Sequence, residues 1–400
     1  MKSLLKISGK ALTALLCAIV TALCLFSVSP IYRFEAPRPF AGPDIYNPYA
    51  GFDTIPHWKR ANFHTHTRVD NILNECPEYP PVVYDDYMKL GYDILAFSNH
   101  NQLTRHPYDS TLQINVYEHG FGLFKFHKLV FNPSKMLLFD HPLPFLVSQK
   151  QWQYDYLSAN ADFLVMNHPD RSFFTTPRSM RLLTSYRLME ADSGISTELT
   201  HWDEALGAGH YSHCILNDDC HDSGDHRRIA IRSSWLATPS ALYEDIRESM
   251  LHGRFYSLRT PDFGNGDADL KRAANASLPS VSDIGVRGDT VFVKLTAPAR
   301  IEATGEGRKM LALAEDGDYL ECRLGEDEPY ARFTAFFEDG NVLYTNAFAR
   351  FDKSLASSPY RVSGHSVDVL LTIAYNAMML ALALLFAGFA LRLAHVKLKS

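Results

Sequence analysis

The sequence predicts an α/β fold with a parallel sheet, followed by a small β-rich region and enclosed between two membrane-spanning helices. Short apolar runs alternate with longer helical patterns from residue 61 to 262. Short strand patterns joined by Gly and Asp turns follow in residues 275–353. Uncharged apolar runs lie near both ends of the chain. These three observations indicate an α/β domain with a β-rich appendage, held at a membrane.

The first apolar run indicates either a signal peptide or an N-terminal transmembrane anchor within residues 1–30. Residues 11–29 carry no charge, and Lys2, Lys6 and Lys10 precede them. Signal peptides and signal anchors share this pattern of a basic start and an apolar stretch. Both interpretations therefore remain open.

The second apolar run predicts a transmembrane helix over residues 367–392. Its uncharged core, residues 369–391, would reach about 35 Å as a helix, which is enough to span a bilayer. A buried core helix is the alternative, but such runs are usually shorter in soluble proteins. The basic residues that follow predict a cytoplasmic tail over residues 393–400.

Composition divides the rest of the chain. Residues 31–60 are rich in Pro, Tyr and Gly and indicate an extended lead-in. Residues 61–262 carry the alternating pattern typical of βα units. Residues 275–353 predict a small β-sandwich, and the polar residues 354–366 predict a linker to the second membrane helix.

Charge and cysteine content exclude two classes of function. The chain has 400 residues with a formal net charge of -6 and no long basic stripe, so we expect no nucleic-acid partner. It has no CxxC pair, which argues against a thiolate zinc knuckle. Cys214 and Cys220 lie in one strand pattern that would hold them too far apart for a disulfide, while other pairings stay open.

Ligand-type side chains recur where apolar runs end. In α/β barrels the loops after the strands converge on one face, which carries the active site. Each segment alone is equally typical of hydrogen-bonded turn residues, but their recurrence on successive strands favours a shared site. The segments are ANFHTHT with His64 and His66, DILAFSNHN with His100, FLVMNHPD with His168, YRLMEADS with Glu190, and CILNDDCHD with Asp218, Asp219 and His221.

The spacing of these residues indicates metal binding. Residues i and i+2 of a strand share a face, so His64 and His66 can hold one ion, as can Asp219 and His221. Imidazole with carboxylate and without thiolate suits Zn, Mn or Fe. The number of ligands exceeds the needs of one tetrahedral ion, which implies two or three divalent transition-metal ions.

The motifs HTH, SNHN, NHPD and DCH resemble those of the PHP (polymerase and histidinol phosphatase) superfamily, in its stand-alone secreted or membrane-associated form. GRFYSLRTP resembles the strand that closes such barrels, and the likeness covers residues 60–350. The resemblance implies a distorted PHP barrel of about seven β/α units with a di- or trinuclear centre, and hydrolysis of phosphoesters. Exonuclease proofreading, known from polymerase-linked members, fits poorly with two membrane segments.

The resemblance also implies the roles of individual residues. His168, Asp219 and His221 are expected to be catalytic. The motif leaves open whether Glu118 or His119 is the bridging ligand, and Asp70 matches with its spacing short by one residue. The expected metal ligands are His64, His66, Asp70, His100, Glu118, His127, His168, Asp219 and His221.

For other residues near the motifs the sequence leaves two roles open. Asn99 stands where the family usually has Asp, which removes a charge beside the expected ligands. Glu190 is expected either to line the pocket floor or to form a structural salt bridge. Arg105, Lys125 and Arg171 are candidates for holding a phosphate, with exposed salt bridges as the alternative.

These expectations combine into a membrane-tethered, metal-dependent hydrolase, a phosphoesterase that uses metal-activated water. Its partners would be a phosphorylated small molecule or envelope component and the lipid bilayer. The alternatives are hydrolysis of amides or lactones, and a non-catalytic metal-binding or sensor module on the same fold.

Topology is the first testable prediction. Basic residues at both ends of the chain place both termini in the cytoplasm and residues 31–365 on the opposite side of the membrane. A reporter that is active only in the cytoplasm, fused after Ser400, should be active. Activity of an exterior-only reporter at the same position would contradict this orientation.

Overall fold

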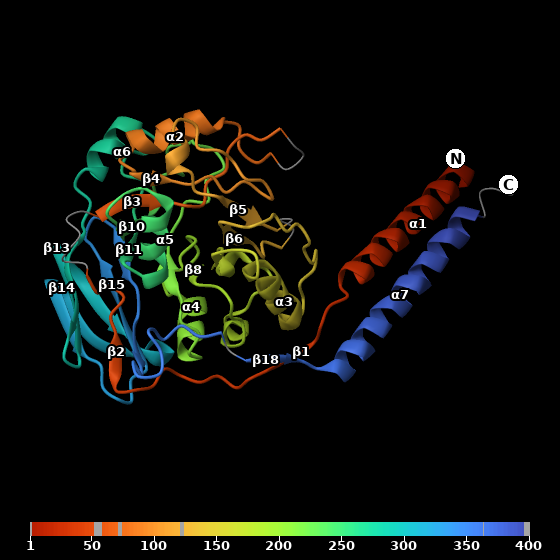
Figure 1. The fold of residues 1–400 in the computed structure, drawn as a ribbon. Helices are drawn as coiled ribbons and strands as arrows, with labels where there is room; N and C mark the ends of the chain where they lie inside the picture. The colour runs from red at the N-terminus through yellow and green to blue at the C-terminus, as the bar shows by residue number, and fades with distance from the viewer. Residues whose placement is uncertain (1, 52–57, 71–73, 121–123, 363, 396–400) are drawn as a thin grey trace. The chain divides into compact units, whose positions relative to one another are not determined.

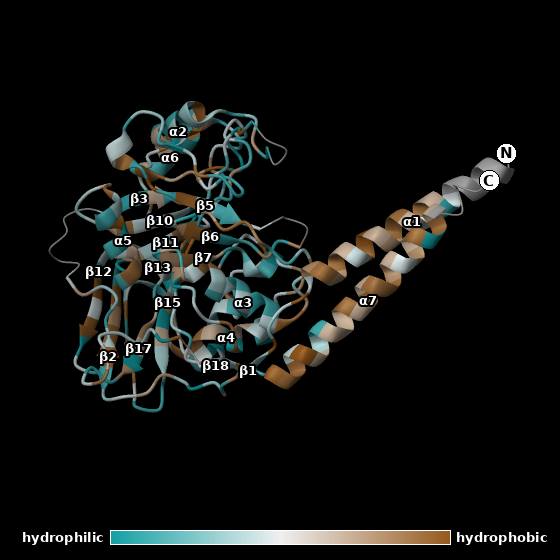
Figure 2. Cartoon of the chain, turned by 45° about the vertical axis from the view of Figure 1, so that its right-hand side comes forward, coloured by the Kyte–Doolittle hydropathy of each residue, from teal (hydrophilic) through white to brown (hydrophobic). Residues whose placement is uncertain are grey.

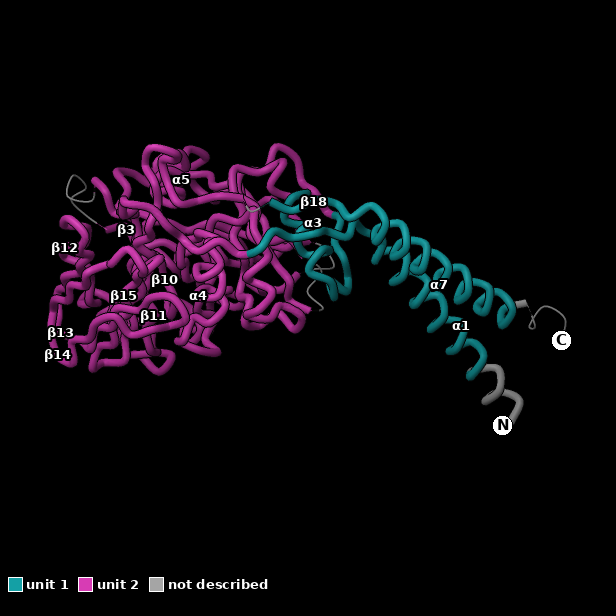
Figure 3. The backbone as a smooth tube through the Cα atoms, turned by 90° about the horizontal axis from the view of Figure 1, so that it is seen from below, with its two compact units in different colours: residues 1–36, 139–156, 363–400 teal, residues 37–138, 157–362 magenta. Residues whose placement is uncertain are grey.

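The computed structural model of the chain describes residues 2–51, 58–70, 74–120, 124–362 and 364–395. They divide into two compact units, shown in Figure 3. Unit 1 comprises residues 1–36, 139–156 and 363–400, and unit 2 comprises residues 37–138 and 157–362.

The two terminal helices of unit 1 lie side by side and run antiparallel (Figure 1). Helix α1 spans Lys2–Phe26 and α7 spans Val369–His395, and both are apolar along most of their length (Figure 2). Their segments Gly9–Phe26 and Val369–Ala394 are long and apolar enough to cross a membrane, and only 6% of each segment is buried. Such low burial is not that of a core helix.

The rest of unit 1 is small. Strand β1 (Tyr32–Phe34) pairs antiparallel with β18 (His365–Val367). Most of helix α3 (Val147–Ser158) also belongs to this unit, although it lies far from both ends in the sequence.

Unit 2 contains a five-stranded sheet whose short strands are buried along their whole length. The first three strands are antiparallel neighbours, whereas the last three are parallel. Continuous burial fits strands that are covered on both faces. In order, they are β5 (Val116–His119), β6 (Lys128–Phe131), β7 (Phe163–Met166), β8 (Leu188–Glu190) and β9 (His213–Ile215).

A second sheet of eleven strands joins the early and late parts of unit 2 in the order β12-β13-β15-β16-β11-β10-β3-β4. Off this path, β14 pairs with β13, and β17 pairs with both β15 and β2. Its strands are β2 (Asp44–Tyr46), β3 (Trp58–Asn62), β4 (Ile94–Leu95), β10 (Arg232–Ala237), β11 (Phe255–Arg259), β12 (Val281–Arg287), β13 (Thr290–Thr304), β14 (Met310–Arg323), β15 (Tyr330–Phe336), β16 (Val342–Thr345) and β17 (Phe348–Phe351).

The mixed α/β class is confirmed, but the described strands do not close into the predicted barrel. Isolated parallel bridges pair Thr65 with Cys220 and His100 with Glu118 where the two sheets meet. The strand directions also differ from those of a parallel β/α barrel: β5, β6 and β7 alternate, and β10 runs antiparallel to β3. The sheets therefore meet where the ligand-bearing segments lie.

The strands of the predicted sandwich belong to the same sheet as β10 and β11. Tyr256 of β11 pairs with Thr345 of β16, so the ladder continues without interruption. One hydrophobic core combines these strands with Tyr49 of the lead-in, and β2 of the lead-in pairs with β17. The β-rich region therefore supports the sheet that carries β3.

The helices of unit 2 pack against these sheets. In α5, Ile246 and Met250 stand four residues apart and are buried in the core beneath the strands. The helix ends at Gly253, whose φ of +81° and close approach to the His213 ring leave no room for a side chain. The helices are α2 (Pro80–Lys89), α4 (Thr200–Gly207), α5 (Tyr243–His252) and α6 (Ala268–Asn275).

A buried ion pair joins α4 to β15. Arg332 Nε donates to Asp203 Oδ1 at 2.8 Å, and its Nη2 donates to Oδ2 at 2.6 Å. Both side chains are almost fully buried, and Tyr330 donates a further hydrogen bond to Asp203. Removing either charge would leave the other buried without compensation.

We therefore expect Arg332→Leu to lower the free energy of unfolding by about 3–5 kcal/mol, because Asp203 loses its buried partner. Chemical denaturation followed by Trp fluorescence measures this. The matched control is Arg323→Ala, whose pair with Asp289 is exposed and should contribute little. Equal losses in the two variants would contradict the structural role of the buried pair.

Candidate metal centre

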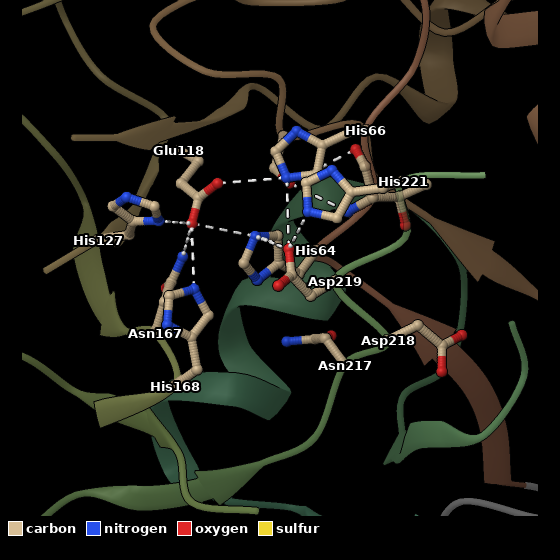
Figure 4. Close-up of polar contacts among 12 residues, drawn as sticks. His64, His66, Glu118, His127, Asn167, His168, Asn217, Asp218, Asp219 and His221 are labelled. Atoms are coloured by element: carbon tan, nitrogen blue, oxygen red, sulfur yellow. Dashed lines mark hydrogen bonds and ion pairs between the residues drawn. The ribbon is translucent and has the colours of Figure 1, made fainter. Parts of the chain in front are cut away.

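The ligand-type side chains come from loops and strand ends of both sheets. His64 and His66 follow β3, and His100 follows β4. Glu118 lies in β5 and His127 immediately precedes β6. His168 follows β7, and Asp219 and His221 follow β9. Figure 4 shows most of these side chains turned toward one another.

Glu118 lies at the middle of this arrangement and is fully buried. Its two carboxylate oxygens face different imidazoles, as a bridging ligand requires. The contacting nitrogens are Nε2 of His64 at 3.1 Å, Nε2 of His66 at 3.2 Å, Nε2 of His100 at 3.1 Å and Nδ1 of His127 at 2.9 Å.

Asp219 is the second carboxylate that faces several imidazoles. Its Oδ1 lies 3.1 Å from Nε2 of His64, 3.4 Å from Nε2 of His66 and 3.3 Å from Nε2 of His221. Glu118 and Asp219 thus face the same pair of imidazoles from two sides (Figure 4).

The candidate ligand atoms form four overlapping groups, within each of which all atoms lie within 4.8 Å of one another. The groups contain every expected ligand except Asp70, and their role as ligands stays a prediction. They are His64, His66, Glu118 and Asp219; His64, His168 and Glu190; His66, Glu75 and His221; and His100, Glu118 and His127.

The structure separates residues that the sequence left as alternatives. Glu118 belongs to two of these groups, whereas the neighbouring His119 belongs to none among the described residues. Asp70 is exposed and lies outside the groups, while Glu75 lies within one. The loop offers both carboxylates, and sequence spacing gave no physical ground for preferring Glu75.

Glu190, whose role the sequence left open, orients His64. Its Oε1 lies 2.9 Å from His64 Nδ1 and accepts a hydrogen bond of 2.9 Å from Asn217. Its Oε2 accepts a hydrogen bond of 3.1 Å from the His168 backbone. A proton held between Nδ1 and Glu190 leaves the lone pair of His64 Nε2 facing Glu118 and Asp219.

Two asparagines hold the surrounding loops. Asn99, at the position where Asp was expected, accepts a hydrogen bond from the Thr67 backbone and donates to the hydroxyls of Thr67 and Thr104. An ionised Asp could accept but not donate. Asn167 donates to Glu118 Oε1 at 2.8 Å and thereby fixes the orientation of that carboxylate.

Two of the candidate ligands have a left-handed backbone. His168 has φ of +26° and Asp219 has φ of +55°. Such a conformation costs a non-glycine residue about 1–3 kcal/mol, and Asp and His are among the residues that adopt it more often than others. The contacts around His168 and Asp219 must stabilise this strained backbone at the place where the candidate ligands converge.

The chemistry of the buried atoms fits divalent cations. His64 Nε2, His66 Nε2 and Glu118 Oε2 are buried and have no hydrogen-bond partner within the described part of the chain. His64 Nε2 lies 3.1 Å from Glu118 Oε1 and His66 Nε2 lies 3.2 Å from Glu118 Oε2, which are ion-pair distances without hydrogen-bond geometry at these nitrogens. A cation shared between imidazole nitrogens and carboxylate oxygens would satisfy all three atoms.

Without such cations, the imidazoles and carboxylates shift each other's pKa. Burial alone would lower the pKa of His64, but the carboxylates around it, Glu118 first, hold that pKa well above 6.5. Burial opposes the shift in His66 as well, yet the nearby carboxylates of Asp219 and Glu118 raise its pKa to about 9. Burial would raise the pKa of Glu118, but the imidazoles of His64, His127 and His100 outweigh it and hold that pKa well below its usual range.

The side of the centre nearest solvent carries a cation. Arg171 Nη1 lies 3.0 Å from Asp219 Oδ2, and its side chain is 27% exposed. The side chains of His221 and Glu75 are also partly exposed, whereas Glu118 is fully buried. Of the three cations proposed to hold a phosphate, Arg171 is the one seen beside a candidate ligand in the described residues.

Cys220 lies within the DCH segment but faces away from the ligands. It is buried in a hydrophobic cluster that also contains Cys76 and Tyr87. Burial raises the pKa of its thiol, so a thiolate is disfavoured there. The cysteines of the described residues are all free.

Comparison with known proteins gives little similarity. No protein-family model and no curated protein matches the chain. One solved structure matches, a two-domain protein containing a predicted PHP-like metal-dependent phosphoesterase from Bacteroides vulgatus ATCC 8482. It is 12% identical and covers 78% of this chain and 99% of its own, with a TM-score of 0.32.

The raised pKa of His66 predicts a pH dependence for the metal-free protein. The stability gained from protonated His66 is present below about pH 6.5 and is lost as pH rises through the folded pKa of about 9. With chelator, the melting temperature should therefore fall across this window. With bound metal it should hold or rise, because ligation needs neutral imidazole.

Scanning fluorimetry at several pH values, with and without chelator, measures this difference. His66→Asn should weaken both trends. The control His252→Asn, which changes an exposed imidazole on α5, should leave both trends unchanged. A chelated protein that is more stable at pH 9 than at pH 6.5 would contradict the assignment.

Proposed function

We propose that this chain is a membrane-anchored, metal-dependent hydrolase that cleaves phosphoesters. The observation that carries the proposal is a pair of carboxylates, buried Glu118 and partly buried Asp219, which both face His64 and His66, whose buried Nε2 atoms lack hydrogen-bond partners. Structural ion pairs rarely leave so many acceptor atoms facing one another.

The overlapping groups favour two or three ions of Zn, Mn or Fe. Glu118 belongs to two groups, so neighbouring ions would share this carboxylate. Bound ions at such a site would polarise a phosphoester and supply a hydroxide nucleophile near neutral pH. No serine or cysteine nucleophile is required.

The residues of this chain would position the substrate. Arg171 already contacts Asp219 at the partly exposed side of the centre, and its guanidinium can bind phosphate oxygens there. His168 and His221 lie on the same centre and are proposed as catalytic residues together with Asp219. The buried side, around Glu118, would exclude water and strengthen each electrostatic contact.

The terminal helices support the anchoring part of the proposal. Two helices of sufficient length and apolarity belong to one unit and are barely buried. With both basic ends in the cytoplasm, the metal centre would lie outside it. A phosphorylated small molecule or an envelope component is then the proposed substrate class.

Two adjacent aspartates allow a sharp test. Asp219→Asn should lower metal-dependent phosphoester hydrolysis at least about 100-fold, because a shared carboxylate of the centre is lost. The rise in melting temperature that metal produces should be smaller than in the wild type, because bound metal stabilises the native state by mass action and the variant binds it more weakly. The full-length chain is tested with Mn²⁺, Zn²⁺ or Fe²⁺ on p-nitrophenyl phosphate and its diester.

Asp218→Asn is the matched control. Asp218 accepts hydrogen bonds from the backbone of Ala230, Ile231 and Arg232 and from the Tyr87 hydroxyl. Its loss should lower the melting temperature equally with and without chelator. Wild-type turnover in Asp219→Asn would contradict the proposal. Metal binding without turnover of phosphoesters would favour amides, lactones or a sensor role instead.

A further inference from the structure

A segment far from the terminal helices in sequence belongs to the same unit as those helices. Residues 139–156, which include most of α3, form one compact unit with α1 and α7 (Figure 3). The backbone carbonyls at the end of a helix have no partner within the helix. The 139–156 segment supplies partners to the end of α1.

Three polar contacts fix this end of α1. His141 Nδ1 lies 2.6 Å from the carbonyl oxygen of Phe26. Gln149 donates to the carbonyl oxygen of Ser27 at 3.0 Å, and Tyr375 of α7 donates to the same oxygen at 3.2 Å. Satisfied carbonyls matter where the end of a helix meets the hydrocarbon of a bilayer, because water is absent from the hydrocarbon.

The apolar surface of α1 continues onto the segment. The apolar stretch that can cross a membrane ends at Phe26, whose side chain is 46% exposed. The ring of Phe139 lies 6.1 Å from the ring of Phe26 and is itself 37% exposed. Phe145, in the uncharged stretch that follows, is 55% exposed.

The charged side chains of the segment are turned inward or paired. Asp140 is buried and accepts a hydrogen bond from Gln153, and Lys150 is 1% exposed. Asp155 contacts His365 Nε2 at 2.6 Å. The segment therefore presents exposed phenylalanines without an exposed charge among them.

Aromatic side chains typical of membrane interfaces complete the segment. Trp152 stacks on Tyr156 at 4.9 Å and meets Phe139 edge-on at 5.3 Å. Trp and Tyr concentrate where the hydrocarbon of a bilayer gives way to headgroups. An apolar surface that lies at the boundary between headgroups and acyl chains is stabilised by burial against lipid.

We propose that Phe139 and Phe145 insert into the interfacial layer of the bilayer crossed by α1 and α7. The inference goes beyond catalysis and rests on the membrane-spanning role proposed for these helices. Lipid is the occupant because the surface is continuous with the apolar side of α1 at the point where the spanning stretch ends. Residues 139–156, which we call the collar, would thereby fix the depth of α1 and α7 in the bilayer.

The test places a tryptophan in the collar of the full-length protein. Phe145→Trp is reconstituted in phosphatidylcholine nanodiscs, with or without lipids brominated close to the headgroup. The emission added by this tryptophan, relative to the wild type, should be lost in brominated lipid. Leu384→Trp, at an exposed position of α7, serves as the membrane control, and Tyr319→Trp, at an exposed position of β14, serves as the aqueous control.

The controls separate the possible failures. If Leu384→Trp is quenched and Phe145→Trp behaves like Tyr319→Trp, the helices lie in the bilayer but the collar does not, and the inference is overturned. If the emission of Leu384→Trp is not quenched either, the proposal that α1 and α7 span a bilayer is contradicted. The insertion of Phe139 and Phe145 is then contradicted as well. Neither outcome bears on the metal-dependent hydrolysis proposed for unit 2, which Asp219→Asn tests separately.

Discussion

A carboxylate buried away from water must be compensated by positive charge, and Glu118 imposes this constraint on the whole centre. Its oxygens face imidazoles from several segments of both sheets, the farthest being His168 Nε2 at 3.5 Å. Compensation comes either from protonated imidazoles or from shared cations. The raised pKa of His66 and the lowered pKa of Glu118 are the signature of the first case. Cations would replace those protons.

The loops around Glu118 are held by a separate polar network. Asn62 donates to the hydroxyls of Thr65 and Tyr87 and accepts a hydrogen bond from the Asp218 backbone. Tyr87 in turn donates to Asp218 at 2.9 Å. The segment with His64 and His66 is thus tied to the segment with Asp219. Stability of the fold and geometry of the centre depend on the same contacts.

The β-rich C-terminal region holds strands that lead to the metal centre, although it supplies no candidate ligand from the described residues. Asn346 accepts a hydrogen bond from the Cys214 backbone and donates to the carbonyls of Gly253 and Phe255. Tyr344 donates to Asp192 in the loop after β8. These contacts fix β9 and the segment after β8. The region therefore stabilises strands that lead to candidate ligands.

The sequence by itself determined what depends on local spacing. The uncharged terminal runs indicated two long apolar helices, and the structure has them at α1 and α7. The HTH, NHPD and DCH segments named side chains that the structure brings together. Local periodicity suffices for these features, because it sets the direction of each side chain relative to its own element.

Only the tertiary structure decided how the elements meet. It joined the sheets without closing a barrel, placed Glu75 among the candidate ligands and left Asp70 exposed outside them, and gave Asp218 its backbone contacts and Glu190 its contact with His64. Each of these outcomes depends on contacts between residues far apart in the chain. Several loop carboxylates are equivalent in sequence, and only packing decides which of them is buried beside imidazoles and which stays in water.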